Sequence, residues 1–194
     1  MHHPDRRPAQ PLKLHDFAPS GHCHRVRLML SLLGLPYESI AVDLLSGEQR
    51  RPPFLALNAF GQVPVLQDGA VTLADSNAIL VYLASKYGDE SWLPSAPVQA
   101  AAVQRWLSVA AGEIAYGPGA ARAQVLFKMP GDAQECIKRA QRLLVVMDQE
   151  LQQRPFLTGA TPTIADVAGY SYIAHAPEGG VALEPYPHVR AWLV

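Results

Sequence analysis

The strongest constraint on the fold is a short stretch in which a strand, a tight turn and a helix follow one another directly. Residues 12–17 have the apolar character of a strand, and Pro19-Ser20-Gly21 is a turn sequence. After the turn, apolar residues recur at i, i+3, i+4 and i+7, the spacing of one helical face: Val26, Met29, Leu30 and Leu33. The sequence therefore predicts a strand that leads straight into the N-terminus of a helix.

The N-terminus of that helix favours a negative charge. Its first amide N–H groups have no acceptor within the helix, and the helix dipole adds to their attraction for an anion. Ser20 adds a hydroxyl donor at the same point. The stretch therefore predicts a bound anion, for which a thiolate is one candidate. The plainer alternative is that Ser20 only caps the helix.

Cysteine and histidine side chains follow within the same turn. Cys23 is a rival nucleophile, because the first turn of a helix can lower the pKa of a thiol, although small cysteines are more often simply buried. His22 and His24 flank it, but the rest of a ligand set is missing, so we expect no metal. With Cys136 there are two cysteines, too few for a disulfide framework, which favours reduced thiols in the cytoplasm.

Composition argues against two classes of partner. The 194 residues carry a net charge of −1, without a long block of Lys or Arg, which argues against binding to nucleic acid. No apolar run reaches the roughly 18 residues that a membrane-spanning helix needs. Residues 1–11 are polar and rich in proline, lack the apolar core of a secretory signal, and are expected to be a disordered lead-in.

The order of the predicted elements gives the fold class. In chain order we expect a strand, a helix, a strand, an irregular helical stretch, two strands and a helix, at residues 12–17, 21–33, 37–44, 46–57, 63–66, 71–73 and 75–87. The first strands need a crossover connection, and Asp68-Gly69 is a hairpin turn for the last two. Residues 12–90 therefore predict an α/β domain of thioredoxin-like size.

After a linker with two prolines, the sequence predicts only helices. Residues 97–194 are expected to form an all-helical domain, in which Gly117-Pro118-Gly119 interrupts a first helix of residues 98–115. Later helices begin at two capping boxes and at a proline: Asp132 with Glu135, Thr163 with Asp166, and Pro187.

Pro64 stands in an apolar strand, where proline normally belongs only at an edge or a special turn. A cis Val63-Pro64 bond would turn the main-chain N–H and C=O of Val63 outward, so that they could pair with a peptide ligand as an added strand. The alternative is an ordinary trans proline at an edge.

Two polar pairs could hold carboxylates. Ser76 and the helix that it begins can bind a carboxylate, while Asp75 can pair with an adjacent ammonium group, although plain helix capping also explains both residues. Gln49 and Arg50 are polar residues that could meet a second carboxylate, or could simply be solvated.

Together these segments resemble a cytosolic glutathione transferase over nearly the whole chain after Pro11. The resemblance is carried by four features in this order: Ser20-Gly21, residues 61–66 (GQVPVL), residues 75–79 (DSNAI) and residues 163–166 (TIAD). It is strongest to bacterial transferases with a Ser-Gly-Asn active-site turn. It implies a thioredoxin-like domain that binds glutathione as cosubstrate and a helical domain that supplies the pocket for a hydrophobic electrophile. It also implies a homodimer.

The resemblance implies a role for each site residue. Ser20 would face the glutathione sulfur, with His22 standing beside it instead of the usual Asn, and Val63 with Pro64 would pair with the cysteinyl backbone. The remaining contacts would be with the γ-glutamyl end, from Gln62, Asp75 and Ser76, and with the glycyl carboxylate, from Gln49, where relatives often have His, and Arg50.

The resemblance also bears on the second domain. Four residues are candidates for the acceptor site, with core packing as the alternative: Trp106, Glu113, Tyr116 and Arg122. Thr163 and Asp166 match a structural box of the family. Ala59 replaces a usual Pro, and the sequence ends at Val194, where relatives continue with a further helix and tail.

The sequence therefore predicts an enzyme in which bound glutathione attacks an electrophile. Two alternatives stay open from the sequence. One is a glutathione-dependent disulfide reductase or peroxidase, and the other is a non-catalytic interaction module that keeps the fold.

Overall fold

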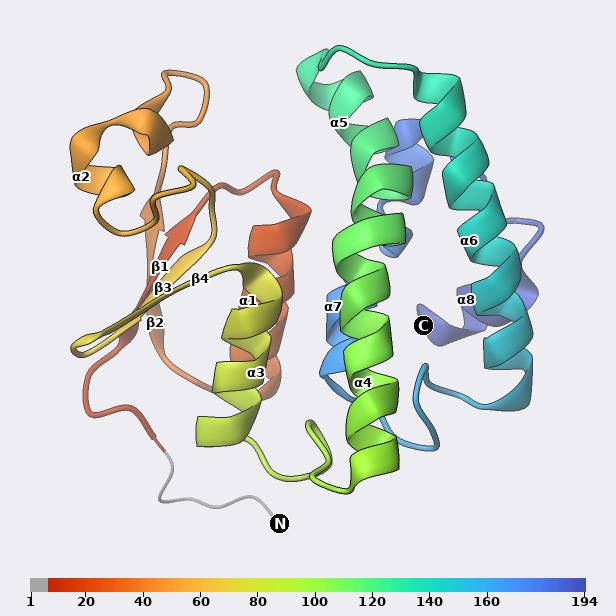
Figure 1. Ribbon diagram of the computed structural model, residues 1–194, viewed down its shortest axis with the longest axis horizontal. Coiled ribbons are helices and arrows are strands. Elements are labelled where there is room, and N and C mark those ends of the chain that lie inside the picture. Colours follow the sequence, from red (N-terminus) through yellow and green to blue (C-terminus); the bar gives the residue numbers. More distant parts are fainter. Residues whose placement is uncertain (1–6) are drawn as a thin grey trace. The chain divides into compact units, whose positions relative to one another are not determined.

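The structure of the protein is a computed structural model that describes residues 7–194 (Figure 1). The chain forms two compact units, one ending at Leu93 and the other beginning at Pro94. Of the predicted lead-in, residues 1–6 lie outside the described part of the chain, and residues 7–11 carry neither helix nor strand.

The first unit is built on a four-stranded mixed sheet. Its strands are β1 (Leu12–Asp16), β2 (Tyr37–Ala41), β3 (Val65–Asp68) and β4 (Val71–Ala74), in the order β2-β1-β3-β4. β1 and β2 are parallel, and the other pairs are antiparallel. The parallel pair needs a crossover, which α1 (Gly21–Leu32) supplies, whereas β3 and β4 need only a tight turn. The predicted thioredoxin-like α/β fold is confirmed.

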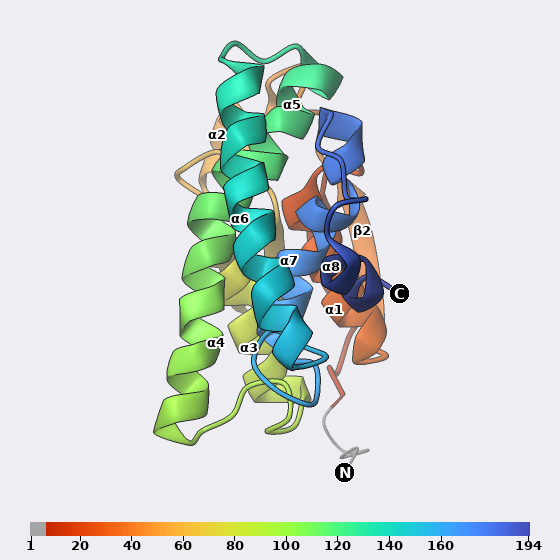
Figure 2. The ribbon, with the colours of Figure 1, turned by 90° about the vertical axis from the view of Figure 1, so that its right-hand side faces the viewer.

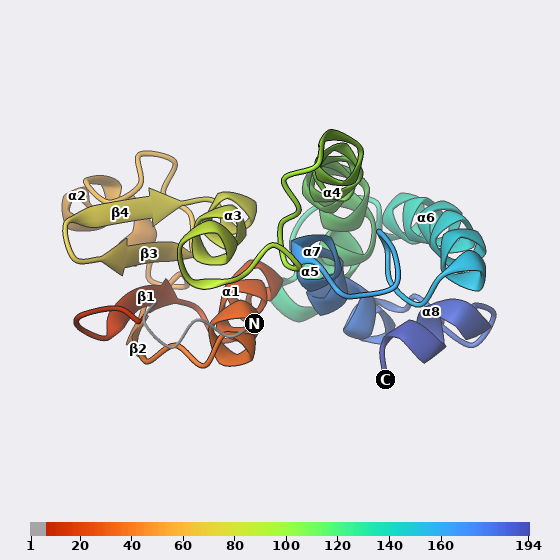
Figure 3. The ribbon, with the colours of Figure 1, turned by 90° about the horizontal axis from the view of Figure 1, so that it is seen from below.

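Helices cover both faces of this sheet. α1 and α3 (Ser76–Tyr87) lie on one face, and α2 (Pro52–Leu55) lies on the other (Figures 1 and 3). Alternate residues of β1 are buried, as the two-residue period of a strand requires. α2 contributes Phe54 to a separate cluster with Val42 and Val65.

Two predicted segments of this unit differ in extent. The second strand ends at Ala41 rather than at residue 44, and the irregular stretch resolves into the 3₁₀ turn η1 (Glu48–Arg50) followed by α2. β3 begins at Val65, two residues later than predicted, because Pro64 has no N–H to contribute to a ladder. Val63 and Pro64 therefore lie just before the sheet.

The second unit is all-helical, as predicted. It contains α4 (Pro97–Val109), the π-helix η2 (Ala110–Gly119), α5 (Ala120–Phe127), α6 (Ala133–Gln153), α7 (Ile164–Ala174), the 3₁₀ turn η3 (Ala176–Gly179) and α8 (Pro187–Trp192). α6 packs against η2 and α8, and α7 packs against α4 (Figure 2). Among residues 7–194, none of the helices is both long enough and apolar enough to cross a bilayer.

The predicted break at Gly117-Pro118-Gly119 is wrong. The chain stays helical from α4 through η2 into α5, and Pro118 lies inside the π-helix. A proline in an α-helix removes one hydrogen bond and clashes with the carbonyl four residues earlier, and a wider π-turn changes that register. The glycines also serve packing, because a Cβ on Gly117 would come within 3.1 Å of the Ala140 nitrogen on α6.

Both predicted N-caps in the second half of the chain form. Thr163 and Asp166 make the reciprocal capping box of α7, and the Asp166 carboxylate also accepts from the Trp192 indole N–H at 3.0 Å. Asp132 caps α6 through the N–H groups of residues 134 and 135. Glu135, predicted to complete that box, pairs with Arg142.

The cap of α8 comes from another helix. Asp148 on α6 accepts hydrogen bonds from the backbone N–H groups of His188 at 2.8 Å and Val189 at 3.0 Å. α8 has six residues and no side-chain cap of its own, so this carboxylate satisfies donors that would otherwise lack a partner. Asp148 and the Trp192–Asp166 bond thus hold α8 at both of its ends.

We predict that Asp148→Ala lowers the free energy of unfolding by about 1–2 kcal/mol, the usual cost of losing an N-cap. Urea denaturation followed by circular dichroism measures this loss. The matched control is Gln149→Ala, one residue further along α6, which should change stability by less than about 0.5 kcal/mol. Equal stability of both variants would show that the cap contributes nothing.

Candidate active site

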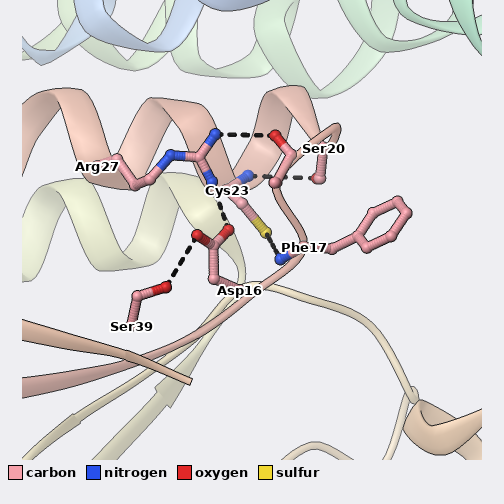
Figure 4. Close-up of polar contacts among 7 residues, drawn as sticks. Asp16, Phe17, Ser20, Cys23, Arg27 and Ser39 are labelled. Atoms are coloured by element: carbon pink, nitrogen blue, oxygen red, sulfur yellow. Dashed lines mark hydrogen bonds and ion pairs between the residues drawn. The ribbon is translucent and has the colours of Figure 1, made fainter. Parts of the chain in front are cut away.

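The turn before α1 is fixed by an ion pair that reaches back from the helix. The Arg27 guanidinium pairs with Asp16 at the end of β1 and also donates to the Ala18 carbonyl at 3.0 Å (Figure 4). Ser39 on β2 donates to the other Asp16 oxygen at 3.2 Å. Asp16 is buried, so these partners replace the water that its carboxylate has lost. The result is a rigid support for Ser20.

Ser20 is the N-cap of α1. Its backbone N–H donates to the Phe17 carbonyl at 2.8 Å, which closes the turn, and its Oγ accepts from the Cys23 backbone N–H at 3.3 Å (Figure 4). A hydroxyl that accepts this bond still has its own proton to donate. The capping role is therefore confirmed, and it leaves Ser20 able to act as a hydrogen-bond donor at the helix N-terminus.

Cys23 is not an available nucleophile. Its side chain is fully buried, its sulfur accepts from the Phe17 backbone N–H at 3.5 Å, and burial raises the pKa of the thiol to about 12. The nucleophile is the thiolate, so a thiol with this pKa is inert at neutral pH. The structure supports the simpler interpretation of Cys23 as a small buried side chain in the core.

His22 turns toward the N-terminus of α3. Its Nδ1 lies 3.2 Å from the Ser76 hydroxyl oxygen. Burial lowers the pKa of the imidazole to about 4, with a further contribution from the positive charge of Arg25 and an opposing one from Asp75. The ring is therefore neutral at pH 7. The structure gives it a partner on α3, and its contact with a ligand sulfur stays a prediction.

Asp75 begins α3 in an uncommon backbone conformation. Its φ is 69°, in a region that residues other than glycine rarely adopt, and its carboxylate accepts from the Ala78 backbone N–H at 2.9 Å. Such strain persists only where the surroundings enforce it, and it gathers at functional sites. Asp75 is exposed, so its carboxylate can cap the helix and remain open to a ligand.

Arg25 is a site residue that the sequence reasoning missed. Its side chain is 1% exposed, and its Nη1 donates to the Ser76 hydroxyl at 2.9 Å and to the Asn77 amide oxygen at 2.7 Å. The sequence did hold a signal, since Arg25 lies four residues before Met29 and so shares the apolar face of α1. A charged residue on an apolar stripe must find buried partners.

The Val63-Pro64 peptide bond is cis, as the sequence pattern favours. The loop before it is held by Asn58, whose side-chain amide donates to the Gln62 carbonyl at 2.8 Å. Gln62 itself is exposed, and Val63 is partly buried. The residues expected to contact a peptide ligand therefore lie on a braced segment.

The other polar pair lies on η1. The Gln49 amide donates to the Leu44 carbonyl at 3.5 Å and is partly buried, whereas Arg50 is exposed. Hydrogen bonds thus join the N-termini of α1 and α3, whereas Gln49 and Arg50 sit on a turn of their own. Their predicted contact with a second carboxylate stays a prediction.

The structure divides the four candidates for an acceptor site. Trp106 is 2% exposed, and Arg122 is buried and paired with Glu178 at 2.6 Å, so for these two the core-packing alternative holds. Both are large side chains on the inner face of a helix. The sequence pattern of such core residues is the same as that of residues lining a pocket. Glu113 lies on η2, and Tyr116 on the same element is 63% exposed. These two stay candidates.

Within residues 7–194, no group of three or more His, Cys, Asp or Glu side chains is arranged to hold a metal ion. What the site does offer is a set of hydrogen-bond donors for anions. It combines two helix N-termini, the Ser20 hydroxyl and a buried guanidinium behind Ser76.

Comparison with known proteins identifies the family. The model of the glutathione S-transferase N-terminal domain matches residues 19–86, and that of the C-terminal domain matches residues 119–194. The chain belongs to the glutathione S-transferase family. Among its relatives is glutathione S-transferase 3 of Zea mays, 36% identical over 94% of this chain and 87% of the relative.

Solved structures agree with this assignment. A glutathione S-transferase from Pseudomonas fluorescens superposes with a TM-score of 0.89 at 36% identity, covering 95% of this chain and 93% of the other. A glutathione transferase homologue from Drosophila mojavensis with bound glutathione gives a TM-score of 0.84 at 29% identity, covering 94% and 85%. The thioredoxin-like domain and the helical domain of this transferase are thus those of the family.

We predict that Cys23 resists thiol reagents in the folded transferase. In a Cys136→Ser variant, labelling at pH 7.5 by an aromatic disulfide reagent should be about a thousandfold slower than for a free cysteine, because the thiolate fraction is that much smaller. Unfolding in urea should restore the ordinary rate. Rapid labelling of the folded variant would contradict the burial of this thiol.

Proposed function

We propose that this enzyme binds glutathione, stabilises its thiolate and promotes the attack of that thiolate on an electrophilic small molecule. The observation that carries the proposal is the Ser20 hydroxyl. It caps α1 as an acceptor at the end of a strand–turn–helix unit braced by Arg27 and Asp16, where the hydroxyl can also donate to a ligand sulfur. A donor fixed at a helix N-terminus favours the charged form of a thiol that binds against it.

The chemistry follows from where charge resides. A cysteinyl thiol in water has a pKa near 8.5, so only a small share is ionised at pH 7. The Ser20 hydrogen bond and the α1 N-terminus favour the thiolate, and the thiol proton leaves to solvent. The thiolate then forms a carbon–sulfur bond with the electrophile, whose leaving group departs with the bonding electrons. Here the protein contributes fixed donors rather than a nucleophile of its own.

The tripeptide would lie along segments that the structure holds in position. Val63, before the cis Pro64, would pair with the cysteinyl backbone, and Gln62 lies beside it in the chain. Asp75 and Ser76 at the N-terminus of α3 would hold the γ-glutamyl end. A carboxylate there gains from the helix dipole, and an ammonium gains from the accessible Asp75 carboxylate.

Fewer observations support the residues proposed for the glycyl end of glutathione and for the electrophilic second substrate. Gln49 and Arg50 on η1 would meet the glycyl carboxylate, for which the exposed Arg50 supplies the positive charge. Glu113 and Tyr116 on η2 would contact the hydrophobic electrophile, since π-helical turns frequently mark functional sites.

The two alternative functions are not favoured. For a glutathione-dependent disulfide reductase or peroxidase, Cys23 could not supply a protein thiol, because it is buried and its pKa is raised. Three relatives named as glutathione S-transferases are 32–36% identical to this chain over 90–94% of its length.

We also propose that the enzyme is cytoplasmic, in keeping with its free cysteines Cys23 and Cys136, and that it forms a homodimer. The homodimer is supported by Phe60, which is 85% exposed on a turn held by hydrogen bonds. Its backbone N–H donates to the Asn58 side chain at 3.1 Å, and the next residue, Gly61, donates to the Asn58 carbonyl at 2.9 Å. Aromatic residues, phenylalanine among them, are enriched at protein interfaces.

We predict that removing the Ser20 hydroxyl lowers kcat/KM with an aryl halide about a hundredfold at pH 6.5, and by much less at pH 9, where the thiol ionises unaided. Ser20→Gly is the informative variant, because glycine caps a helix almost as well as serine. Ser20→Thr, which keeps a hydroxyl, is the control. Unchanged activity, or an equal loss at every pH, would show that Ser20 does not stabilise the thiolate.

We predict that Phe60→Ser raises the dissociation constant of the dimer about thirtyfold or more, as expected for an interface anchor. Light scattering on a dilution series measures it. Leu45→Ser is the matched control, because Leu45 is 83% exposed on a different loop of the same unit. A monomeric wild type would overturn the dimer, and an equal effect of both variants would overturn the role of Phe60.

A further inference from the structure

Ser76 is the centre of a chain of three side chains. The buried Arg25 donates to its hydroxyl oxygen at 2.9 Å, and the His22 Nδ1 lies 3.2 Å from the same oxygen. Arg25 is 1% exposed and Ser76 is 3% exposed. The hydroxyl therefore has protein groups, rather than bulk water, as its immediate neighbours.

Hydrogen-bond accounting fixes the direction of these contacts. A guanidinium only donates, so the Ser76 oxygen accepts from Arg25, and the hydroxyl proton is left to be donated elsewhere. A buried hydroxyl proton needs an acceptor, and Nδ1 of the neutral His22 ring is one within reach. In the protein without ligand, Ser76 then donates its proton to Nδ1, and the ring proton of His22 sits on Nε2.

We propose that Arg25 is a positioning residue that orients Ser76 for a ligand carboxylate, and that His22 accepts the Ser76 hydrogen bond until the carboxylate takes it. This inference rests on the proposed role of Ser76 at the γ-glutamyl end of glutathione. It assigns functions to Arg25, which no sequence motif pointed to, and to His22, which was expected beside the sulfur.

Arg25 acts through Ser76 and through its charge, since its burial keeps it from the ligand. Its Nη1 is also held by the Asn77 amide oxygen at 2.7 Å, so the guanidinium lies directly beneath the first turn of α3. A cation is unfavourable at a helix N-terminus, where the dipole is already positive. An anion bound at Ser76 would offset the positive charge of Arg25 and the positive end of the α3 dipole. The site should therefore bind a carboxylate more tightly than a neutral group.

When the Ser76 hydroxyl donates to the ligand carboxylate instead of to His22 Nδ1, the tautomer of His22 changes but its charge does not. When a carboxylate accepts from the hydroxyl, Nδ1 must become a donor to the Ser76 oxygen, and the ring proton moves through solvent from Nε2 to Nδ1. Ser76 then accepts from Arg25 and from His22 and donates to the ligand, which uses both lone pairs and the proton. The imidazole stays neutral throughout.

A cycle of two variants and two ligands tests the role of Arg25. Arg25→Gln should weaken glutathione binding about tenfold, the usual scale for a hydrogen bond to a charged group. The same change should alter binding of 4-aminobutyryl-cysteinylglycine, which lacks the γ-glutamyl α-carboxylate, by less than about twofold. Ser31→Ala, which removes an exposed hydroxyl from the same helix, α1, should affect neither ligand. Equal losses for both ligands would mean that Arg25 is merely structural, and would overturn the proposal.

A measurement on the unaltered protein covers the case in which Arg25→Gln does not fold. The ¹⁵N chemical shifts of the His22 ring distinguish its tautomers, so added glutathione should move the protonated nitrogen from Nε2 to Nδ1, and the analogue should not. An unchanged tautomer with glutathione bound would overturn the role of His22. Absence of glutathione binding by the wild type would instead overturn the proposed function, so the two failures are distinguishable.

Discussion

The active-site region depends on the burial of one guanidinium. Arg25 lies on the apolar face of α1 and finds its oxygen partners on the first turn of α3, at Ser76 and Asn77. A hydrogen bond to a charged group typically contributes about 1.5–3 kcal/mol, so these contacts help to join the two helices. Both N-termini are thereby held together, and His22 can bridge them.

Local chemistry made the framework predictable. The strand–turn–helix unit, the cap at Ser20 and the box at Thr163 and Asp166 each depend on residues within a few positions of one another, which sequence displays directly. The cis bond before Pro64 was one of the two alternatives that the position of this proline in an apolar strand left open. The fold class followed from the order of these signals.

What sequence did not show was set by contacts between distant segments. The partners of Arg25 lie on another helix, and Asp148 caps α8 from a distant part of the chain. The helix continues through Pro118 as the π-helix η2, and Gly117 packs closely against α6 in this conformation. Local sequence does not display that contact. Burial of Trp106 likewise depends on helices that its own sequence neighbourhood does not reveal.

The inaccessible sulfur of Cys23 has a consequence for an enzyme of this kind. Compounds that react with the glutathione thiolate are alkylating agents, and any ionised cysteine near the bound thiolate would compete for them. With Cys23 kept protonated in the core, the reactive sulfur at the proposed site is that of the cosubstrate, so each encounter would consume a replaceable tripeptide instead of the catalyst.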